Sequence, residues 1–360
     1  MGQTRKEWPW LIANVACIVM GGSQEHTGRA AANNTQRGAA VEQAVVGRFA
    51  PTPSGRMHAG NVFAALMAWL GVRSAGGRMV LRIEDLDPRA HKPEATQLLL
   101  DDLRWLGLNW DEGPYFQSKR YEVYAEALSQ LDQQGLVYPC FCTRAELHAA
   151  TAPHASDGTY LYAGTCRNLS PAEVAQRAAM RPPALRLRVP TENDPAGSIC
   201  FDDLVFGAQR EVLARECGDF IVRRSDGVFA YQLAVVVDDA LMGVNQVVRG
   251  QDLLASSARQ IYLQRLLGYE QPTYAHAPLL VTPQGRRLSK RDRDLDLGEI
   301  RARDAGPERL LGRLGAMVGL ASEGEAVSAS ELVERFSWET IRTHAQSSIV
   351  VEQTVHLNRV

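Results

Sequence analysis

The chain has 360 residues, of which 45% are hydrophobic and 22% are charged, a composition ordinary for a folded protein of roughly two domains. Its formal net charge of -2 excludes a globally basic RNA-binding protein, so any contact with nucleic acid must come from a local cluster of Arg and Lys. Six cysteines in a chain of this length do not require disulfide bonds, and we expect a reduced, cytoplasmic protein.

The first 46 residues differ in composition from the rest of the chain. Residues 30–44 are rich in Ala, Asn, Gln and Gly without an apolar period, which indicates disorder. The apolar run at residues 8–20 could be a signal peptide, but it contains Asn14 and is too short to span a bilayer. We therefore interpret residues 1–46 as a non-essential extension, and no other segment reaches transmembrane length.

Predicted strands and helices alternate from residue 47 onward. In order, the elements are a strand at 47–51, a turn at 51–55, a helix at 58–74, a strand at 78–84 and a helix at 92–106. This order favours an α/β fold with a doubly wound, Rossmann-like parallel sheet and helices on its faces.

Residues 110–227 interrupt this alternation, and we interpret them as an α+β insertion into a catalytic domain at 47–298. The insertion is predicted to hold helices at 121–134 and 171–180 and a strand at 184–189. The sheet then resumes with predicted strands at 229–237, 246–249 and 278–281 and a helix at 253–267.

Residues 299–360 are predicted to form a helical tail. Only 70 residues follow Lys290 (360 minus 290), which is enough for two or three helices. A segment this short would not support a large separate domain of its own.

The sequence RFAPTPSGRMHAGN at residues 48–61 joins a strand, a tight turn and the start of a helix. The free backbone N–H groups and the positive dipole end of a helix N-terminus suit a triphosphate. Gly60 would let a phosphate or an adenine approach the backbone, and His58 could stabilise charge that develops during phosphate transfer. Taken alone, His58 could equally be a surface side chain in an ordinary turn.

The sequence RRLSKR at residues 286–291 predicts a mobile basic loop after Gly285. Lys290 could hold a leaving pyrophosphate as a point charge. The alternative for the loop taken alone is a solvated run of charges.

In this order, the two sequences resemble the HIGH and KMSKS regions of class I glutamyl-tRNA synthetases. The sequences LRIEDLD at residues 81–87 and VRGQDL at residues 248–253 also resemble that family, so the resemblance covers residues 47–298. It implies that ATP, with Mg²⁺, activates glutamate as an adenylate, without a Ser-His-Asp triad. It also implies catalytic roles for His58, Gly60, Asn61, Ser289 and Lys290, with ATP contacts from His58, Gly60 and Lys290.

A dicarboxylic amino acid needs a cation for its side chain and an anion for its ammonium group. Arg48 and Arg249 resemble the carboxylate-binding arginines of the family, Glu84 the residue that receives the ammonium group, and Tyr231 the pocket tyrosine. The same glutamate site would include Phe49, Ala50, Pro51 and Thr52. Without the family motifs, the three charged side chains could equally form surface ion pairs, and Tyr231 could be an aromatic residue of the core.

Cys140, Cys142 and Cys166 supply three thiols, whereas tetrahedral zinc requires four ligands. The resemblance implies a structural Zn²⁺ module at about residues 138–168, with Tyr162 as the fourth ligand. Tyr160 and His154 are rival fourth ligands, and three free cysteines are the alternative to a metal site.

Full-length members of this family carry an anticodon-binding domain after the KMSKS region, and the tail of this chain is too short for one. In length, in motif order and in the Cys-x-Cys…Tyr-x-x-x-Cys pattern, the chain resembles a truncated branch of the family, the glutamyl-Q tRNA(Asp) synthetases. That resemblance implies glutamate activation without tRNA, followed by esterification of the queuosine base in the tRNA(Asp) anticodon. The basic side chains that could contact tRNA phosphates beside the site, or simply be solvated, are Arg286, Arg287, Arg291 and Arg293.

Two other functions remain open. One is a glutamyl-tRNA synthetase with a shortened tail that charges the 3′ end of tRNA(Glu). The other is a non-catalytic regulator that binds RNA or glutamate, against which the presence of His58, Gly60, Ser289 and Lys290 argues. In each case we expect a monomer that does not contact a membrane.

Overall fold

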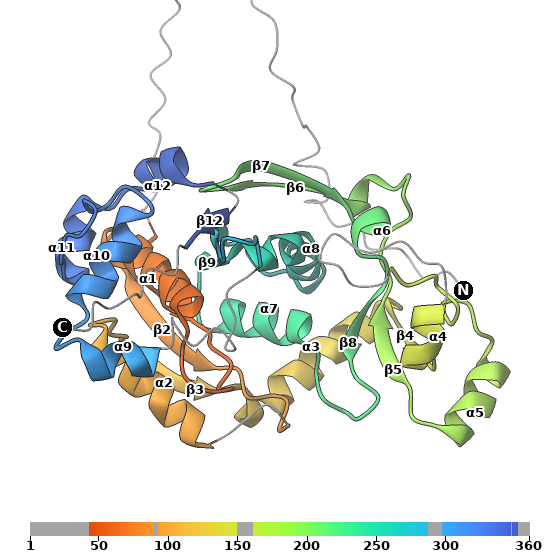
Figure 1. Ribbon diagram of the computed structural model, residues 1–360. Helices are drawn as coiled ribbons and strands as arrows, with labels where there is room; N and C mark the ends of the chain where they lie inside the picture. The colour runs from red at the N-terminus through yellow and green to blue at the C-terminus, as the bar shows by residue number, and fades with distance from the viewer. Residues whose placement is uncertain (1–42, 90–92, 150–160, 287–296, 347, 352–360) are drawn as a thin grey trace, which may run out of the picture. The chain divides into compact units, whose positions relative to one another are not determined.

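The computed structural model describes residues 43–89, 93–149, 161–286, 297–346 and 348–351, and its elements are labelled in Figure 1. The chain divides into Met1–Gln43 and Ala44–Val360, and every element below belongs to the second unit. None of the helices in the described ranges is both long and apolar enough to cross a membrane.

The first half of the main sheet is parallel. β1 (Val46–Phe49) pairs with β2 (Arg78–Ile83), which pairs with β3 (Glu112–Phe116). α1 (Ala59–Arg73) follows β1, and α2 (Pro93–Trp105) follows β2. The predictions for both helices and for the first two strands are confirmed, with ends that agree to within two residues.

The second half of the sheet has the order β7-β6-β10-β9. β9 (Gln246–Gly250) and β6 (Ser198–Asp203) both run parallel to β10 (Thr273–Ala277), and β7 (Gly207–Val212) is antiparallel to β6. α8 (Ser257–Leu267) connects β9 to β10. The predictions at 246–249 and 253–267 are confirmed as β9 and α8, whereas β6, β7 and β10 were not predicted.

Asn245 joins the two halves of the sheet. Its backbone N–H donates to the carbonyl of Val46 at 3.0 Å, and its Oδ1 accepts from the Val46 N–H at 2.8 Å. β1 therefore lies beside β9, with β2 and β3 on one side and β10 and β6 on the other. The strand order reverses between β1 and β9, and this switch point is where ligands bind in open α/β sheets.

Alternate side chains of the strands enter two separate cores. Met79 and Leu81 of β2 pack with α1 and α2, whereas Val80 packs in a second core with α3, α7 and α8. Likewise, Val248 of β9 enters the first core and Val247 the second. Because successive strand residues point to opposite faces, helices cover both faces, and the predicted doubly wound fold is confirmed.

The predicted strand at 229–237 is wrong, because Tyr231–Leu241 forms the helix α7. All five residues from Leu233 to Val237 are buried, and α7 packs against α8 and α3 near the centre of Figure 1. A helix buried on every side has no polar face, so its sequence carries no helical period. The three consecutive valines at 235–237 favour a strand locally, and tertiary packing overrides that preference.

Between β3 and α7 lies a second, antiparallel sheet with the order β4-β5-β8. Its strands are β4 (Val137–Cys140), β5 (Ala184–Leu187) and β8 (Phe220–Arg223). The accompanying helices are η1 (Gln117–Lys119), α3 (Tyr121–Gln133), α4 (Arg144–Ala149), α5 (Pro171–Met180), η2 (Pro195–Gly197) and α6 (Leu213–Glu216). The predictions at 121–134, 171–180 and 184–189 are confirmed as α3, α5 and β5, while the proposed boundaries of an insertion at 110–227 remain a prediction.

The described part of the tail is helical, as predicted, but holds four helices rather than two or three. They are α9 (Leu297–Arg303), α10 (Glu308–Ala316), α11 (Ala329–Arg335) and α12 (Trp338–His344). Leu311 and Leu332 join the core around α1, so these helices form part of that core. The predicted strand at 278–281 is β11 (Leu279–Val281), which pairs with the unpredicted strand β12 (Ser348–Val350).

Candidate active site

A cavity of about 540 Å³ opens at the carboxyl ends of β1 and β9, where the strand order reverses. Every predicted site residue of this region that the structure describes lines it, namely Arg48, Phe49, Ala50, Pro51, Thr52, His58, Gly60, Asn61, Glu84, Tyr231 and Arg249. Ser289 and Lys290 lie outside the described residues, as do Arg287, Arg291 and Arg293, whereas Arg286 is described and exposed.

The turn from β1 into α1 forms one wall of the cavity. His58 is the N-cap of α1, and its Nδ1 accepts a hydrogen bond from the Gly60 N–H at 3.2 Å. A Cβ on Gly60 would lie 3.1 Å from the His58 ring, so the glycine leaves room for this ring orientation. The carbonyl of Pro51 accepts from the Glu84 N–H at 3.0 Å, which fixes the turn to the end of β2.

Arg48 and Glu84 face the cavity from neighbouring strand ends. Arg48 Nη1 donates to the Val248 carbonyl at 2.8 Å, and its Nε lies 3.6 Å from Asp239 Oδ1. Burial raises the pKa of Glu84 to about 7, although the nearby guanidinium groups of Arg82 and Arg48 act in the opposite direction. Arg82 Nη2 lies 3.5 Å from Glu84 Oε1, so this guanidinium favours the ionised carboxylate while burial opposes it.

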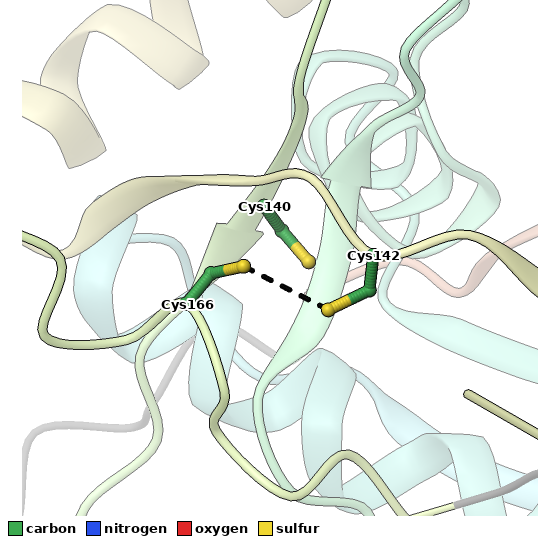
Figure 2. Close-up of side chains that lie close together, drawn as sticks. All are labelled: Cys140, Cys142 and Cys166. Carbon is green, nitrogen blue, oxygen red and sulfur yellow. Dashed lines mark hydrogen bonds between the residues drawn. The ribbon is translucent and has the colours of Figure 1, made fainter. Parts of the chain in front are cut away.

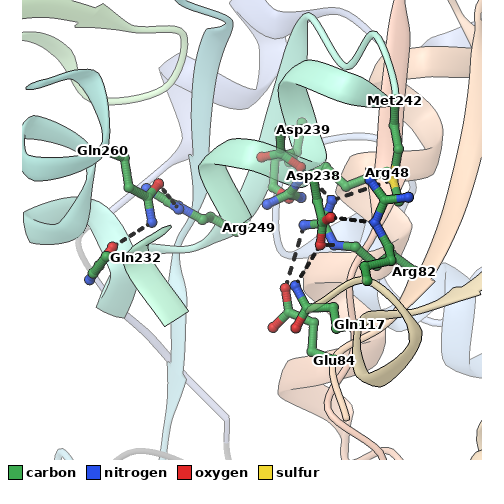
Figure 3. Close-up of polar contacts among 12 residues, drawn as sticks. Arg48, Arg82, Glu84, Gln117, Gln232, Asp238, Asp239, Met242, Arg249 and Gln260 are labelled. Carbon is green, nitrogen blue, oxygen red and sulfur yellow. Dashed lines mark hydrogen bonds and ion pairs between the residues drawn. The ribbon is translucent and has the colours of Figure 1, made fainter. Parts of the chain in front are cut away.

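A buried ionic cluster adjoins Arg48 and Glu84, and Figure 3 shows the side chains that form it. Arg82 has no exposed side-chain surface; its Nη1 lies 2.7 Å from Asp239 Oδ1 and its Nε 3.6 Å from Asp238 Oδ2. Asp238 also accepts hydrogen bonds from Gln117, Arg120 and Tyr124 at 2.7–2.8 Å. The sequence analysis missed this cluster, although Arg82 lies within one of its motifs, because Asp238 and Asp239 belong to the helix that was predicted as a strand.

Arg249 approaches the cavity from β9, on the other side of the switch point. Its Nη1 donates to Gln260 Oε1 at 2.7 Å, its Nη2 to Ser257 Oγ at 2.8 Å and its Nε to His276 Nε2 at 3.0 Å. Gln260 in turn donates to Gln232 Oε1 at 2.7 Å, and Figure 3 shows this chain of amides running away from Arg249. The sequence predicted Arg249 but none of the three acceptors.

Tyr231 is the first residue of α7 and lines the same cavity. Burial and the neighbouring Glu84 raise the pKa of its phenol, so the side chain stays neutral at physiological pH. A neutral phenol there can donate a hydrogen bond to a ligand without adding charge.

The predicted metal ligands meet in a separate small core of the insertion region. The Sγ atoms of Cys140, Cys142 and Cys166 all lie within 4.8 Å of one another. Figure 2 shows the three side chains pointing toward one another. Tyr162 Oη lies 3.5 Å from Cys140 Sγ and 3.8 Å from Cys142 Sγ, and the sulfurs of Cys142 and Cys166 are 3.7 Å apart. The rival ligands His154 and Tyr160 lie outside the described residues.

These spacings fit a tetrahedral ion. With Zn–S bonds of about 2.3 Å, two sulfurs of one tetrahedron lie about 3.8 Å apart, close to the separation of Cys142 and Cys166. A phenolate oxygen with a bond of about 2.0 Å would lie about 3.5 Å from each sulfur. The separation between the sulfurs of Cys142 and Cys166, and those between Tyr162 Oη and the sulfurs of Cys140 and Cys142, therefore agree with the size of a zinc site.

Residues 44–354 match the protein family described as the catalytic domain of class I tRNA synthetases for glutamate and glutamine (E and Q). The glutamyl-Q tRNA(Asp) synthetase of Symbiobacterium thermophilum is 49% identical over 302 residues, which cover 81% of this chain and 91% of that protein. That of Nitratidesulfovibrio vulgaris is 45% identical and covers 82% of this chain and 93% of that protein. The chain belongs to the glutamyl-Q tRNA(Asp) synthetase family.

Solved structures agree with this family. The glutamate-tRNA synthetase of Elizabethkingia anophelis superposes with a TM-score of 0.72 at 27% identity, covering 85% of this chain and 68% of that chain. The glutamate tRNA ligase of Elizabethkingia meningosepticum, in complex with its amino acid, gives a TM-score of 0.71 at 25% identity, over 87% and 67% of the two chains. The predicted family and its class I fold are confirmed, while the roles of individual site residues remain predictions.

Proposed function

We propose that this protein activates glutamate with ATP to glutamyl-adenylate in the absence of tRNA, and then transfers glutamate to the queuosine base of tRNA(Asp). The observation that carries the proposal is the convergence of Arg48, Glu84 and Arg249 on one cavity beside the His58 turn, in a chain of the glutamyl-Q tRNA(Asp) synthetase family.

The charges of the cavity support glutamate as its amino acid. The described hydrogen-bond acceptors of Arg249 are all neutral groups, so its positive charge is available to a carboxylate of the ligand. The charge of Arg48 is partly balanced by Asp239, so we assign to this arginine a weaker contact with the other carboxylate of glutamate. Glu84 offers the anion that the ammonium group needs, and Phe49, Ala50, Pro51 and Thr52 complete the wall.

ATP would lie along the turn before α1. His58, Gly60 and Asn61 line the cavity where the first turn of this helix presents free N–H groups. Ser289 and Lys290 are proposed to act on the leaving pyrophosphate, with Mg²⁺ bound to the phosphates of ATP. Because the α-carboxylate of glutamate is itself the nucleophile, positioning and charge stabilisation are the main tasks of these residues.

Cys140, Cys142, Tyr162 and Cys166 would hold one structural Zn²⁺ per chain, supported by the spacing of their ligand atoms. A closed set of four protein ligands stabilises a fold and leaves no open position for catalysis. We also propose that the protein acts as a cytoplasmic monomer, since its tRNA substrate is found there. Arg286, Arg287, Arg291 and Arg293 would contact tRNA phosphates beside the cavity.

The test separates the two chemical steps. Glutamate-dependent exchange of pyrophosphate into ATP should proceed without tRNA, and labelled glutamate should then transfer to tRNA(Asp) that contains queuosine. A transcript of the same tRNA(Asp) without queuosine is the matched control and should accept none. If exchange requires tRNA, or if a tRNA(Glu) transcript is charged instead, the protein is a glutamyl-tRNA synthetase with a shortened tail.

A further inference from the structure

Arg249 is held rigidly by side chains from two elements. Ser257 and Gln260 of α8 accept from its two terminal nitrogens, and His276 of β10 accepts from its Nε–H at 3.0 Å. Only 6% of Arg249 is exposed, and the three acceptors are themselves buried. The guanidinium plane is therefore fixed before any ligand arrives, which reduces the entropy lost on binding.

The bond from Arg249 fixes the tautomer of His276. An arginine Nε–H can only donate, so Nε2 of His276 must be unprotonated, and the ring proton must lie on Nδ1. That nitrogen lies 2.6 Å from Asp203 Oδ2, and neither side chain has any exposed surface. Burial lowers the pKa of His276 to about 4, so the ring is neutral at physiological pH.

Asp203 is in turn fixed by the backbone. Its Oδ1 accepts from the N–H groups of Val205 and Phe206 at 3.0 Å and of His276 at 3.3 Å. Its Oδ2 is left to accept the His276 proton. The hydrogen bonds therefore run in one direction: Arg249 donates to His276, His276 donates to Asp203, and the backbone N–H groups donate to Asp203.

This arrangement holds Arg249 without neutralising it. Arg48 and Arg82 both lie within 4 Å of the carboxylate of Asp239, whereas the described partners of Arg249 are a hydroxyl, an amide and a neutral imidazole. A carboxylate in contact with Arg249 would compete with the carboxylate of a ligand. His276 lies between Asp203 and the guanidinium, so Asp203 orients Arg249 through His276 without contacting it.

We propose that Asp203 and His276 are positioning residues that hold Arg249 as an uncompensated cation for the side-chain carboxylate of glutamate, and that they thereby set the preference for glutamate over glutamine. This inference rests on the proposed function, in which Arg249 binds that carboxylate. Glutamine offers no negative charge, so it gains less from a fixed cation than glutamate does.

Asp203→Asn tests the arrangement with almost no change in volume. The three backbone N–H groups require an oxygen at the Oδ1 position, so the new NH₂ must face Nδ1 of His276. The ring proton of His276 would then move to Nε2. Two donors would face each other there, and the hydrogen bond from the Nε–H of Arg249 would be lost. We expect KM for glutamate to rise about 10- to 100-fold in pyrophosphate exchange, with kcat and KM for ATP nearly unchanged. The ratio of kcat/KM for glutamate over glutamine should fall by a similar factor.

Asp219→Asn is the matched control. This carboxylate is also buried and also accepts a backbone N–H, from Val189 at 2.8 Å, but it lies in the insertion region and does not line the cavity. It should lower thermal stability to a similar degree and leave KM for glutamate unchanged. Equal rises in KM in the two variants would show general destabilisation and would overturn the inference.

His276 gives a second, independent comparison. His276→Gln can still accept from Arg249 through Oε1 and donate to Asp203 through its amide, so it should keep most of the affinity for glutamate. His276→Leu can do neither and should raise KM as Asp203→Asn does. If both His276 variants bind glutamate as the wild type does, the inference is wrong, whether or not Asp203→Asn folds.

Arg249→Ala distinguishes a failure of the positioning role from a failure of the proposed glutamate site. If Arg249→Ala leaves KM for glutamate unchanged, the proposed glutamate site itself is wrong. If Arg249→Ala raises KM strongly while the Asp203 and His276 variants behave as their controls, the glutamate site stands and only the positioning role fails.

Discussion

At the scale of single residues, Glu84, which lines the cavity, and His276, which accepts a hydrogen bond from Arg249, have pKa values that burial shifts in opposite directions. Glu84 keeps 11% of its side-chain surface exposed, and its partial burial raises its pKa to about 7, whereas the full burial of His276 lowers its pKa to about 4. Burial disfavours the charged form in both cases, so it moves an acid and a base in opposite directions. Of these two groups, Glu84 is the one whose charge changes near neutral pH.

This shift predicts a pH dependence for glutamate use. The ammonium group requires ionised Glu84, and a folded-state pKa of about 7 leaves less of that form as pH falls. The kcat/KM for glutamate should therefore rise with pH to a plateau above 7 and fall roughly tenfold per unit well below it. Pyrophosphate exchange at saturating ATP measures this profile, with KM for ATP as the internal control. Glu84→Gln should be slower at every pH and flat across this range, and an unchanged slope in that variant would assign the titration to another group.

Lys290 is predicted to act on the pyrophosphate rather than on the amino acid. Lys290→Ala should lower kcat for exchange by about 10²-fold, because a charge that stabilises the transition state is lost, while glutamate affinity changes little. Steady-state exchange over a range of glutamate and ATP concentrations separates the two effects. An unchanged kcat would remove Lys290 from the proposed mechanism.

At the scale of elements, Asp102 of α2 connects segments that precede and follow the basic sequence at residues 286–291. Its side chain is fully buried; Oδ1 accepts from Arg56, in the turn before α1, at 3.0 Å and from Arg301 of α9 at 2.8 Å. The N–H of Leu297 also donates to the carbonyl of Met57 at 3.3 Å. These hydrogen bonds and ion pairs thus connect the turn that carries His58 with α9.

Removing that carboxylate should loosen the connection. Asp102→Ala is expected to lower the free energy of unfolding by about 1–3 kcal/mol, discounted from buried-pair values because both arginines are partly exposed. The neighbouring Asp101 pairs with Arg104 on the surface of α2, so Asp101→Ala should cost no more than about 0.5 kcal/mol. Urea denaturation of both variants makes the comparison, and equal losses would contradict a connecting role for Asp102.

At the scale of the whole molecule, the sheet that carries the cavity is combined with a cluster of three cysteines that could hold a metal ion. If Cys140, Cys142, Tyr162 and Cys166 hold Zn²⁺, the purified protein should contain about one zinc per chain by native mass spectrometry. Removal of the metal by a chelator should lower Tm, since metal binding contributes directly to folding free energy.

Cys142→Ser should reduce the zinc content, because a hydroxyl is a poor substitute for a thiolate ligand. Cys200→Ser is the matched control: Cys200 lies in β6, outside the cluster, so this variant should retain the metal. A wild-type protein without zinc, or equal zinc in the two variants, would show that the three cysteines do not form a metal site.

Several features could be predicted from the sequence because they depend on residues close together in the chain. The turn at residues 51–55, the helix that follows it and the strands at 47–51 and 78–84 carry their own signals in prolines, glycines and apolar spacing. The motifs around His58, Glu84 and Arg249 likewise marked the residues that line the cavity. Their convergence follows from the parallel order of strands, which brings the carboxyl ends together.

The tertiary structure alone decided how those residues are supported. Arg82 meets Asp239 across 157 positions of sequence, and Asp203 meets His276 across 73, and nothing local marks either pair. The helix α7 also required the fold, because a segment buried on all sides loses the period that would reveal it. The sequence by itself determined the fold class, the family and several of the residues that line the cavity, since these rest on local patterns. The partners that fix their charge and orientation were decided by packing between distant segments, which no local pattern records.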